Sequence, residues 1–185
     1  RCDAGKSCHL MEANMSELRI VGELMAVAAR TAPKTAGKDY VVTRVLEGDD
    51  VRTFGQQMID YGAEHGLRNF DRDGRNVCAS DTMVLIGLRD AQTTGLDCGA
   101  CGVEFCSALE PNSLDGQFRG PQCAFRLVDV GIAIGSAAKM AGLLNADNRI
   151  MYRAGVVARQ MGWIDADFVL GIPLSATGKS IYFDR

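Results

Sequence analysis

Residues 82–88 read Thr-Met-Val-Leu-Ile-Gly-Leu, an almost unbroken apolar run. A strand with one solvated face would alternate apolar and polar residues, so this run predicts a strand buried on both faces. The β-branched run at residues 40–46 predicts a second strand, followed by a turn at 47–49. The apolar run at residues 168–172 predicts a third strand. Together these runs indicate a small central sheet.

Two helices are expected before the buried strand. The first has Ser16 as its N-cap and ends before Pro33, and its apolar residues recur at helical spacing as Leu18, Val21, Met25 and Ala28. The second covers about residues 50–66, with a buried stripe of Val51, Phe54, Met58 and Tyr61.

Two more helices are expected after the buried strand. Residues 124–144 are dense in glycine, alanine and serine, and small side chains let a helix approach its neighbours closely. We therefore expect this helix to be the central buried one. Another helix is expected over residues 149–160, capped by Asp147 or Asn148. The element order predicts an α+β fold, or an α/β sandwich, with helices packed on the sheet.

Composition limits the class of protein. The chain has 185 residues, of which 47% are hydrophobic, and a formal net charge of −3. We expect a single globular domain over residues 16–185, preceded by residues 1–15 as a native extension or an expression remnant. The charge argues against nucleic acid as a partner, and no apolar run approaches the ~20 residues that span a bilayer. A cytoplasmic location follows as an expectation.

Four of the seven cysteines gather in one segment, residues 95–125: Cys98, Cys101, Cys106 and Cys123. An odd total concentrated in this way is a poor disulfide framework. The C-x2-C pair lets two thiolates converge on one metal centre, and glycines beside it allow backbone N–H groups to point at the sulfurs. Cys123 precedes the 124–144 helix, whose positive end favours a thiolate. These four cysteines are the predicted metal ligands.

Two alternatives remain for these cysteines. A structural zinc site also uses four thiolates, but it usually arranges them as two C-x2-C knuckles, and Cys106 and Cys123 form no second knuckle. Unliganded buried or redox-sensing thiols are the other alternative. Cys2, Cys8 and Cys78 are interpreted as ordinary thiols, and His65 as a surface or helix-end residue.

The spacing C-x2-C-G-x3-C-x16-C resembles the iron–sulfur domain of the large subunit of corrinoid iron–sulfur proteins and of electron-transport-complex subunits. That resemblance implies a [4Fe-4S] cluster. Over roughly residues 18–185 the chain also resembles a bacterial and archaeal family described as ferredoxin-domain-containing. The segments that carry this resemblance lie at 29–34, 95–102, 129–138, 147–153 and 171–180.

A looser resemblance is to the flavin-dependent nitroreductases, through residues 30–33, 129–138 and 169–173. It implies a nitroreductase-like sandwich, a homodimer and a bound flavin whose phosphate faces Arg30, Lys34 or Lys179. The alternative is that these are solvated surface charges. Gly178-Lys179-Ser180 does not complete a P-loop, because Pro173 stands where the first glycine is required.

We therefore expect an iron–sulfur protein with one [4Fe-4S] cluster that transfers electrons to a redox partner protein or a small electron carrier. One alternative is a flavin-dependent reductase with an accessory cluster, which makes the chain a possible oxidoreductase. The other is a zinc-stabilised interaction domain.

Overall fold

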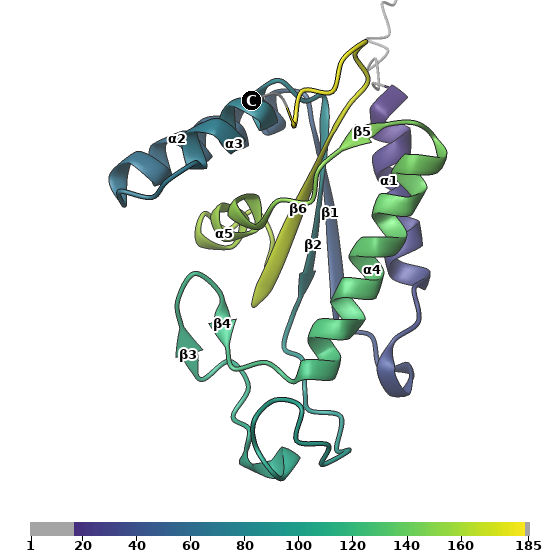
Figure 1. The fold of residues 1–185 in the computed structure, drawn as a ribbon, viewed down its shortest axis with the longest axis vertical. Coiled ribbons are helices and arrows are strands. Elements are labelled where there is room, and N and C mark those ends of the chain that lie inside the picture. The colour runs from purple at the N-terminus through teal and green to yellow at the C-terminus, as the bar shows by residue number, and fades with distance from the viewer. Residues whose placement is uncertain (1–16, 184–185) are drawn as a thin grey trace, which may run out of the picture.

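The computed structural model describes residues 17–183 as one antiparallel sheet between two layers of helices (Figure 1). The four strands lie in the order β1-β2-β6-β5 and have the bounds β1 Val41–Glu47, β2 Thr82–Leu88, β6 Phe168–Ser175 and β5 Asp147–Asn148. The fold is α+β, as predicted. Ser16 and residues 1–15 lie outside the described residues, so the predictions made for them stay predictions.

Strand β2 is the centre of the fold. All seven of its residues are buried, which confirms the prediction from the apolar run. Val84 lies opposite Val45 of β1 and Ile172 of β6, so β2 pairs with a neighbour on each side. Because successive side chains point to opposite faces, β2 contributes residues to both hydrophobic cores.

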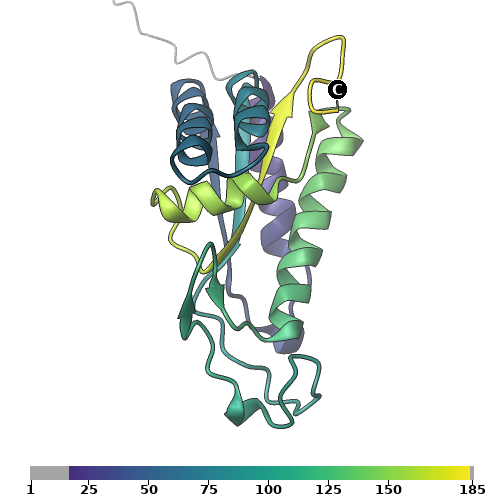
Figure 2. The ribbon, with the colours of Figure 1, turned by 60° about the vertical axis from the view of Figure 1, so that its left-hand side comes forward.

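Helices α1 (Glu17–Thr31) and α4 (Ala124–Leu143) lie side by side on one face of the sheet (Figures 1 and 2). The expectation that the 124–144 helix would be the central buried one is wrong. Ala133 and Ala137 face the core, but Val128 is 51% exposed and Gly131 is also exposed, because the sheet and α1 cover only one side of α4. Among residues 17–183, no helix combines the length and the hydropathy needed to span a bilayer.

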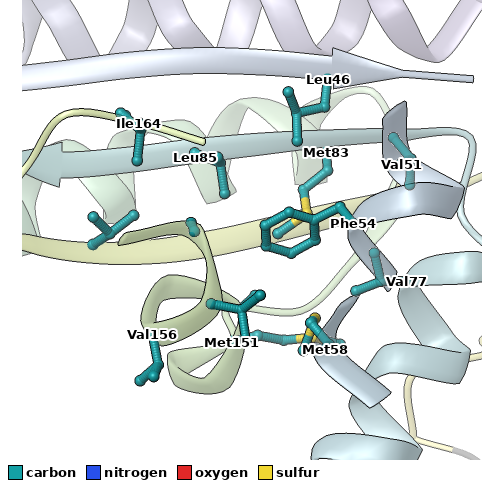
Figure 3. Close-up of a cluster of buried hydrophobic side chains, with 14 of the residues drawn as sticks. Leu46, Val51, Phe54, Met58, Val77, Met83, Leu85, Met151, Val156 and Ile164 are labelled. Carbon is teal, nitrogen blue, oxygen red and sulfur yellow. The ribbon is translucent and has the colours of Figure 1, made fainter. Parts of the chain in front are cut away.

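Helices α2 (Asp49–Glu64), α3 (Phe70–Cys78) and α5 (Tyr152–Gln160) cover the opposite face. Figure 3 shows Phe54 and Met58 of α2 and Val77 of α3 gathered against Met83 of β2. The second predicted helix is confirmed as α2. The sequence analysis did not anticipate α3.

Helix α5 packs so closely on β6 that a Cβ atom on Gly155 would lie 1.7 Å from the carbonyl oxygen of Val169. The predicted cap of this helix is wrong. Asp147 and Asn148 form β5 at the sheet edge, and Met151 then donates its N–H to the Gly171 carbonyl over 2.7 Å. These sheet contacts keep the chain extended, so the helix begins at Tyr152.

Candidate metal centre

The predicted cysteine ligands lie on one long connection between β2 and α4, which extends beyond one end of the sheet (Figures 1 and 2). We call residues 89–123 the cysteine loop. Its regular structure is limited to a 3-10 turn at Cys106–Ala108 and a short hairpin of β3 (Leu114–Asp115) and β4 (Arg119–Gly120). Cys98, Cys101 and Cys106 lie in the middle of this loop, and Cys123 lies where it enters α4.

One carboxylate joins the start of the cysteine loop to its second half. Asp167 is 2% exposed and lies just before β6. Its Oδ2 accepts the backbone N–H of Asp90 over 2.6 Å and the side-chain amide of Asn112 over 3.1 Å. Its Oδ1 lies 3.5 Å from a guanidinium nitrogen of Arg119. The sequence analysis missed Asp167, although an aspartate directly before an apolar strand is a residue that needs buried partners.

Cys123 is the N-cap residue of α4 and is 3% exposed. Burial by itself raises the pKa of the Cys123 thiol, but the backbone N–H groups of Thr94, Arg126 and Phe125 stabilise the thiolate, so the pKa lies below its ordinary value. The Thr94 hydroxyl is also 3.9 Å from the sulfur. The thiolate of Cys123 is therefore stabilised where α4 begins, and its role as a metal ligand stays a prediction.

Cys106 is held by reciprocal bonds to Asp97. The backbone N–H of Asp97 donates to the Cys106 sulfur over 3.4 Å, and the backbone N–H of Cys106 donates to Asp97 Oδ1 over 2.6 Å. Asp97 has a positive φ of 47°, a conformation that a short polar side chain tolerates better than most. This turn supplies one of the N–H donors to sulfur that the glycine-rich sequence predicted.

Cys98 and Cys101 are the more accessible pair. Cys98 is exposed and Cys101 is half-buried. Gly99 has a φ of 70° and its carbonyl accepts the N–H of Gly102 over 3.0 Å, which closes the C-x2-C turn. Such a turn brings two sulfurs to one side of the backbone.

The donor set fits a four-thiolate centre in its chemistry, because four free cysteines lie on one loop and two of them already receive backbone N–H groups. Within residues 17–183, however, no three or more side chains of histidine, cysteine, aspartate or glutamate are arranged around one point as metal ligands. The assignment of Cys98, Cys101, Cys106 and Cys123 as ligands thus stays a prediction.

A buried ion pair ties α4 to its surroundings one turn after Cys123. Arg126 is 0% exposed and its Nη1 lies 3.0 Å from Asp129 Oδ2. Its Nε donates to the carbonyl of Gln92 over 3.0 Å, and its Nη1 donates to the carbonyl of Thr35 over 3.0 Å. Arg126 therefore fixes the start of α4 against the start of the cysteine loop. Two opposite charges three residues apart in a mainly apolar helix are the signal that the sequence analysis overlooked.

Comparison with known proteins identifies the family. An "Uncharacterized protein" from Archaeoglobus fulgidus is 45% identical over 169 residues, which cover 91% of this chain and 91% of that protein. Residues 119–185 match a family described as "Uncharacterized protein containing a ferredoxin domain (DUF2148)". The chain belongs to this ferredoxin-domain family. The matched region includes Cys123 and ends after the described residues.

Solved structures of nitroreductases share the fold of this family member. A nitroreductase with bound FMN from Desulfitobacterium hafniense has a TM-score of 0.55 and 15% identity, covering 86% of this chain and 78% of that chain. The nitroreductase CinD from Lactococcus lactis, in complex with chloramphenicol, has a TM-score of 0.58 and 12% identity, covering 92% and 86%. The looser resemblance seen in the sequence therefore holds for the fold.

The residues predicted to face a flavin phosphate differ in their surroundings. The Lys34 side chain is 6% exposed, and its ammonium group donates to the carbonyls of Ala29 and Arg30 over 2.8 and 2.6 Å. Lys34 thus caps the last turn of α1. Arg30 is 57% exposed, whereas Lys179 lies in an exposed part of the C-terminal segment.

The remaining cysteine and histidine of the described chain lie away from the cysteine loop in the fold. Cys78 ends α3 and is half-buried, and burial raises the pKa of its thiol. His65 follows α2 and stacks on Tyr61 at 4.1 Å between ring centroids. Both positions agree with the structural roles predicted for them. Cys2, Cys8 and His9 lie outside the described residues.

Proposed function

We propose that this protein is an iron–sulfur redox protein that holds one [4Fe-4S] cluster on Cys98, Cys101, Cys106 and Cys123 and transfers electrons. The ferredoxin-domain family and the nitroreductase fold support a redox role. The observation that carries the finer proposal is the cysteine loop, which holds four free thiols. Asp167 joins Asp90 to Asn112, with Cys98, Cys101 and Cys106 between them, and Cys123 follows at the start of α4.

When bound, such a cluster accepts and releases single electrons. The residues of the loop supply its protein environment. Cys123 provides a buried thiolate, while Asp97 and Thr94 direct N–H groups at two of the sulfurs. Hydrogen bonds to cluster sulfurs raise the reduction potential by stabilising negative charge, so these groups favour the reduced state.

The test is metal, sulfide and flavin analysis on protein purified without exposure to air. We expect iron and acid-labile sulfide in near-equal amounts, and a broad visible absorption that a strong reductant bleaches. Cys101→Ser should lower the iron content, and Cys78→Ser provides a matched control because Cys78 lies on α3, in the helix layer on the far side of the sheet from α4. Full iron retention in Cys101→Ser would show that the ligand assignment is wrong.

Zinc provides the contrasting result. Colourless protein with one zinc ion per chain and no sulfide would replace the redox proposal by a zinc-stabilised interaction domain.

A flavin-dependent reductase with an accessory cluster is the second candidate, because the fold is shared with a nitroreductase that binds FMN. A flavin adds a two-band yellow spectrum and is released as a fluorescent molecule on denaturation. Detection of one flavin per chain together with iron and sulfide would favour this reductase over a simple electron carrier.

The composition of the cysteine loop indicates the kind of protein partner that would accept its electrons. Residues 90–118 contain five acidic residues and no lysine, arginine or histidine. Leu96 and Phe105 beside the cysteines are 56% and 53% exposed. We propose a redox partner with an apolar contact surface and a basic rim, and electron transfer to it should slow as the salt concentration rises.

A further inference from the structure

We propose that a groove beside the edge strand β1 binds a small molecule that carries phosphate groups on an aromatic or apolar body. The groove has a volume of about 520 Å³, and its walls include Arg30, Val42, Arg44, Arg89, Trp163 and Asp165. We call it the arginine groove. This inference does not depend on the cluster proposed above, because none of the four predicted cysteine ligands lines the groove.

Three arginines from separate elements converge on the groove. Arg30 lies in the last turn of α1, Arg44 lies in β1, and Arg89 directly follows β2. Asp165 is the one acidic residue that lines the same hollow among the described residues. The groove therefore carries an excess of positive charge, which attracts anions.

Nearby carboxylates neutralise these arginines weakly. Arg89 lies 3.6 Å from Asp165, and Arg30 lies 4.0 Å from Asp39. Both distances exceed those of strong charge-assisted hydrogen bonds, which are about 2.7–2.9 Å. Arg30 and Arg89 are also 57% and 49% exposed, so their guanidinium groups can meet a ligand from solvent.

Backbone carbonyls hold two of the guanidinium groups in place. Arg30 donates to the carbonyl of Val41 over 3.2 Å, and Arg44 donates to the carbonyl of Trp163. A carbonyl restricts the side chain but leaves its full positive charge, and a guanidinium has further N–H donors to offer. Such preorganised forks match the oxygens of a phosphate group.

The aromatic wall of the groove is equally fixed. The Trp163 ring packs edge-on against Phe54 at 5.5 Å between centroids, and its N–H donates to Gln57 Oε1 over 2.6 Å. Val42 and Ile164 add apolar surface beside it. Apolar walls combined with a few oriented cations are typical of sites for phosphorylated organic molecules.

The two neighbouring hollows define the extent of the site. One of about 360 Å³ shares Gly162, Ile164 and Asp165 with the groove and adds Arg119 and Arg159. The other, of about 450 Å³, places Asp39 and Asp90 beside Arg30 and Arg89. Arg119 and Arg159 are paired with Asp167 and Asp115, so the least neutralised positive charge lies in the middle, in the arginine groove itself, where we expect the phosphates to bind.

Trp163 allows a direct test because it is the single tryptophan of the chain. The full-length protein is titrated with ADP, inorganic pyrophosphate and adenosine, using tryptophan fluorescence and isothermal calorimetry. We expect saturable binding of ADP, weaker binding of pyrophosphate, and the weakest binding of adenosine. Arg44→Gln and Arg89→Gln should each weaken ADP binding about tenfold or more.

Arg75→Gln is the matched control, because Arg75 is a 63% exposed arginine on α3, away from the groove. Equal weakening in Arg75→Gln would overturn the site in favour of diffuse attraction. Absence of ADP binding in both measurements would overturn the proposal, and so would adenosine that binds as tightly as ADP. Pyrophosphate that binds as tightly as ADP would overturn the proposal that the ligand carries an aromatic or apolar body. Iron and sulfide measured on the same samples report on the proposed cluster separately.

Discussion

At the scale of single residues, Asp167 ties the cysteine loop to the start of β6. Asp167→Ala leaves the Asp90 N–H and the Asn112 amide without their acceptor. We expect a loss of about 2 kcal/mol or more in the free energy of unfolding, together with faster amide hydrogen exchange at Asp90. Chemical denaturation and exchange measurements check both effects. Asp165→Asn is the control, because Asp165 is 87% exposed, and equal effects in both variants would contradict the role of Asp167.

Tyr182 should make stability depend on pH in alkaline solution. Burial raises the pKa of Tyr182 well above its ordinary value; the hydrogen bond with Ser80 opposes this, and the charges of Asp147 and Asp81 add to it. The Ser80 hydroxyl also bonds to the Asn76 carbonyl, so Tyr182 donates to Ser80 over 2.8 Å.

The folded-state pKa of Tyr182 exceeds the unfolded value of about 10. The stabilisation is thus complete below pH ~10 and is lost above it, by about 1.4 kcal/mol per pH unit. Tyr182→Phe should cost ~1 kcal/mol near neutral pH and lack this alkaline decline. Unfolding free energies of both proteins on either side of pH ~10 test this, and parallel pH curves would show that Tyr182 is not responsible.

The four cysteines could be selected from the sequence because their signal is local spacing. Asp167 and Arg126 could not, because their partners are distant in the chain: Asp90 lies 77 residues before Asp167, and Gln92 lies 34 residues before Arg126. Single-sequence patterns contain no information on which distant backbone groups a buried charge will meet. The contacts of Asp167 and Arg126 that hold the cysteine loop are therefore visible only in the folded chain.

At the scale of elements, the contact between α5 and β6 depends on Gly155. A Cβ at this position would lie 1.7 Å from the Val169 carbonyl oxygen and 2.5 Å from its carbon, and backbone atoms cannot move aside as a flexible side chain can. Gly155→Ala should therefore lower the free energy of unfolding by about 3 kcal/mol or more. Gly142→Ala in α4 is the control, because nothing lies within 4 Å of its Cβ position. Thermal or chemical unfolding that ranks the two variants equally would contradict this packing argument.

The sequence predicted an element where its apolar pattern was strong. It missed an element where tertiary contacts, and not the apolar pattern, stabilise the secondary structure. Strand β2 and helix α2 have clear patterns and were predicted. Helix α3 was missed because its sequence, Phe-Asp-Arg-Asp-Gly-Arg-Asn-Val-Cys, contains few apolar residues. It is stabilised instead by packing on α2, and by Asp73, which is 2% exposed and lies 2.7 Å from Arg72 and 2.9 Å from Arg153.

At the scale of the whole molecule, the outer surface of the α1–α4 layer is more apolar than a solvated surface requires. Exposed residues follow each other at helical spacing on α1 as Ile20, Leu24 and Val27, with exposures of 53%, 41% and 58%, and on α4 as Val128 and Ile132, with 51% and 40%. Gly131 and Gly135 of α4 are also exposed, and a Cβ at either position would meet nothing within 4 Å. Large exposed apolar patches usually mark interaction sites.

We therefore expect the protein to form a homodimer through this layer, with the glycines allowing a second copy to approach the α4 backbone.

Gly135→Leu separates association from folding, since the isolated chain has room for the side chain and a helix favours leucine over glycine. Light scattering should show a dimer for the native protein and at least a tenfold higher dissociation constant for Gly135→Leu and Ile132→Lys. Met161→Lys, at the end of α5 in the opposite layer, should leave the dimer intact. A stable dimer needs about 800 Å² buried per partner, which a layer of two long helices can supply. A native protein that stays monomeric at every concentration, or a Gly135→Leu variant that dimerises normally, would place the interface elsewhere or remove it.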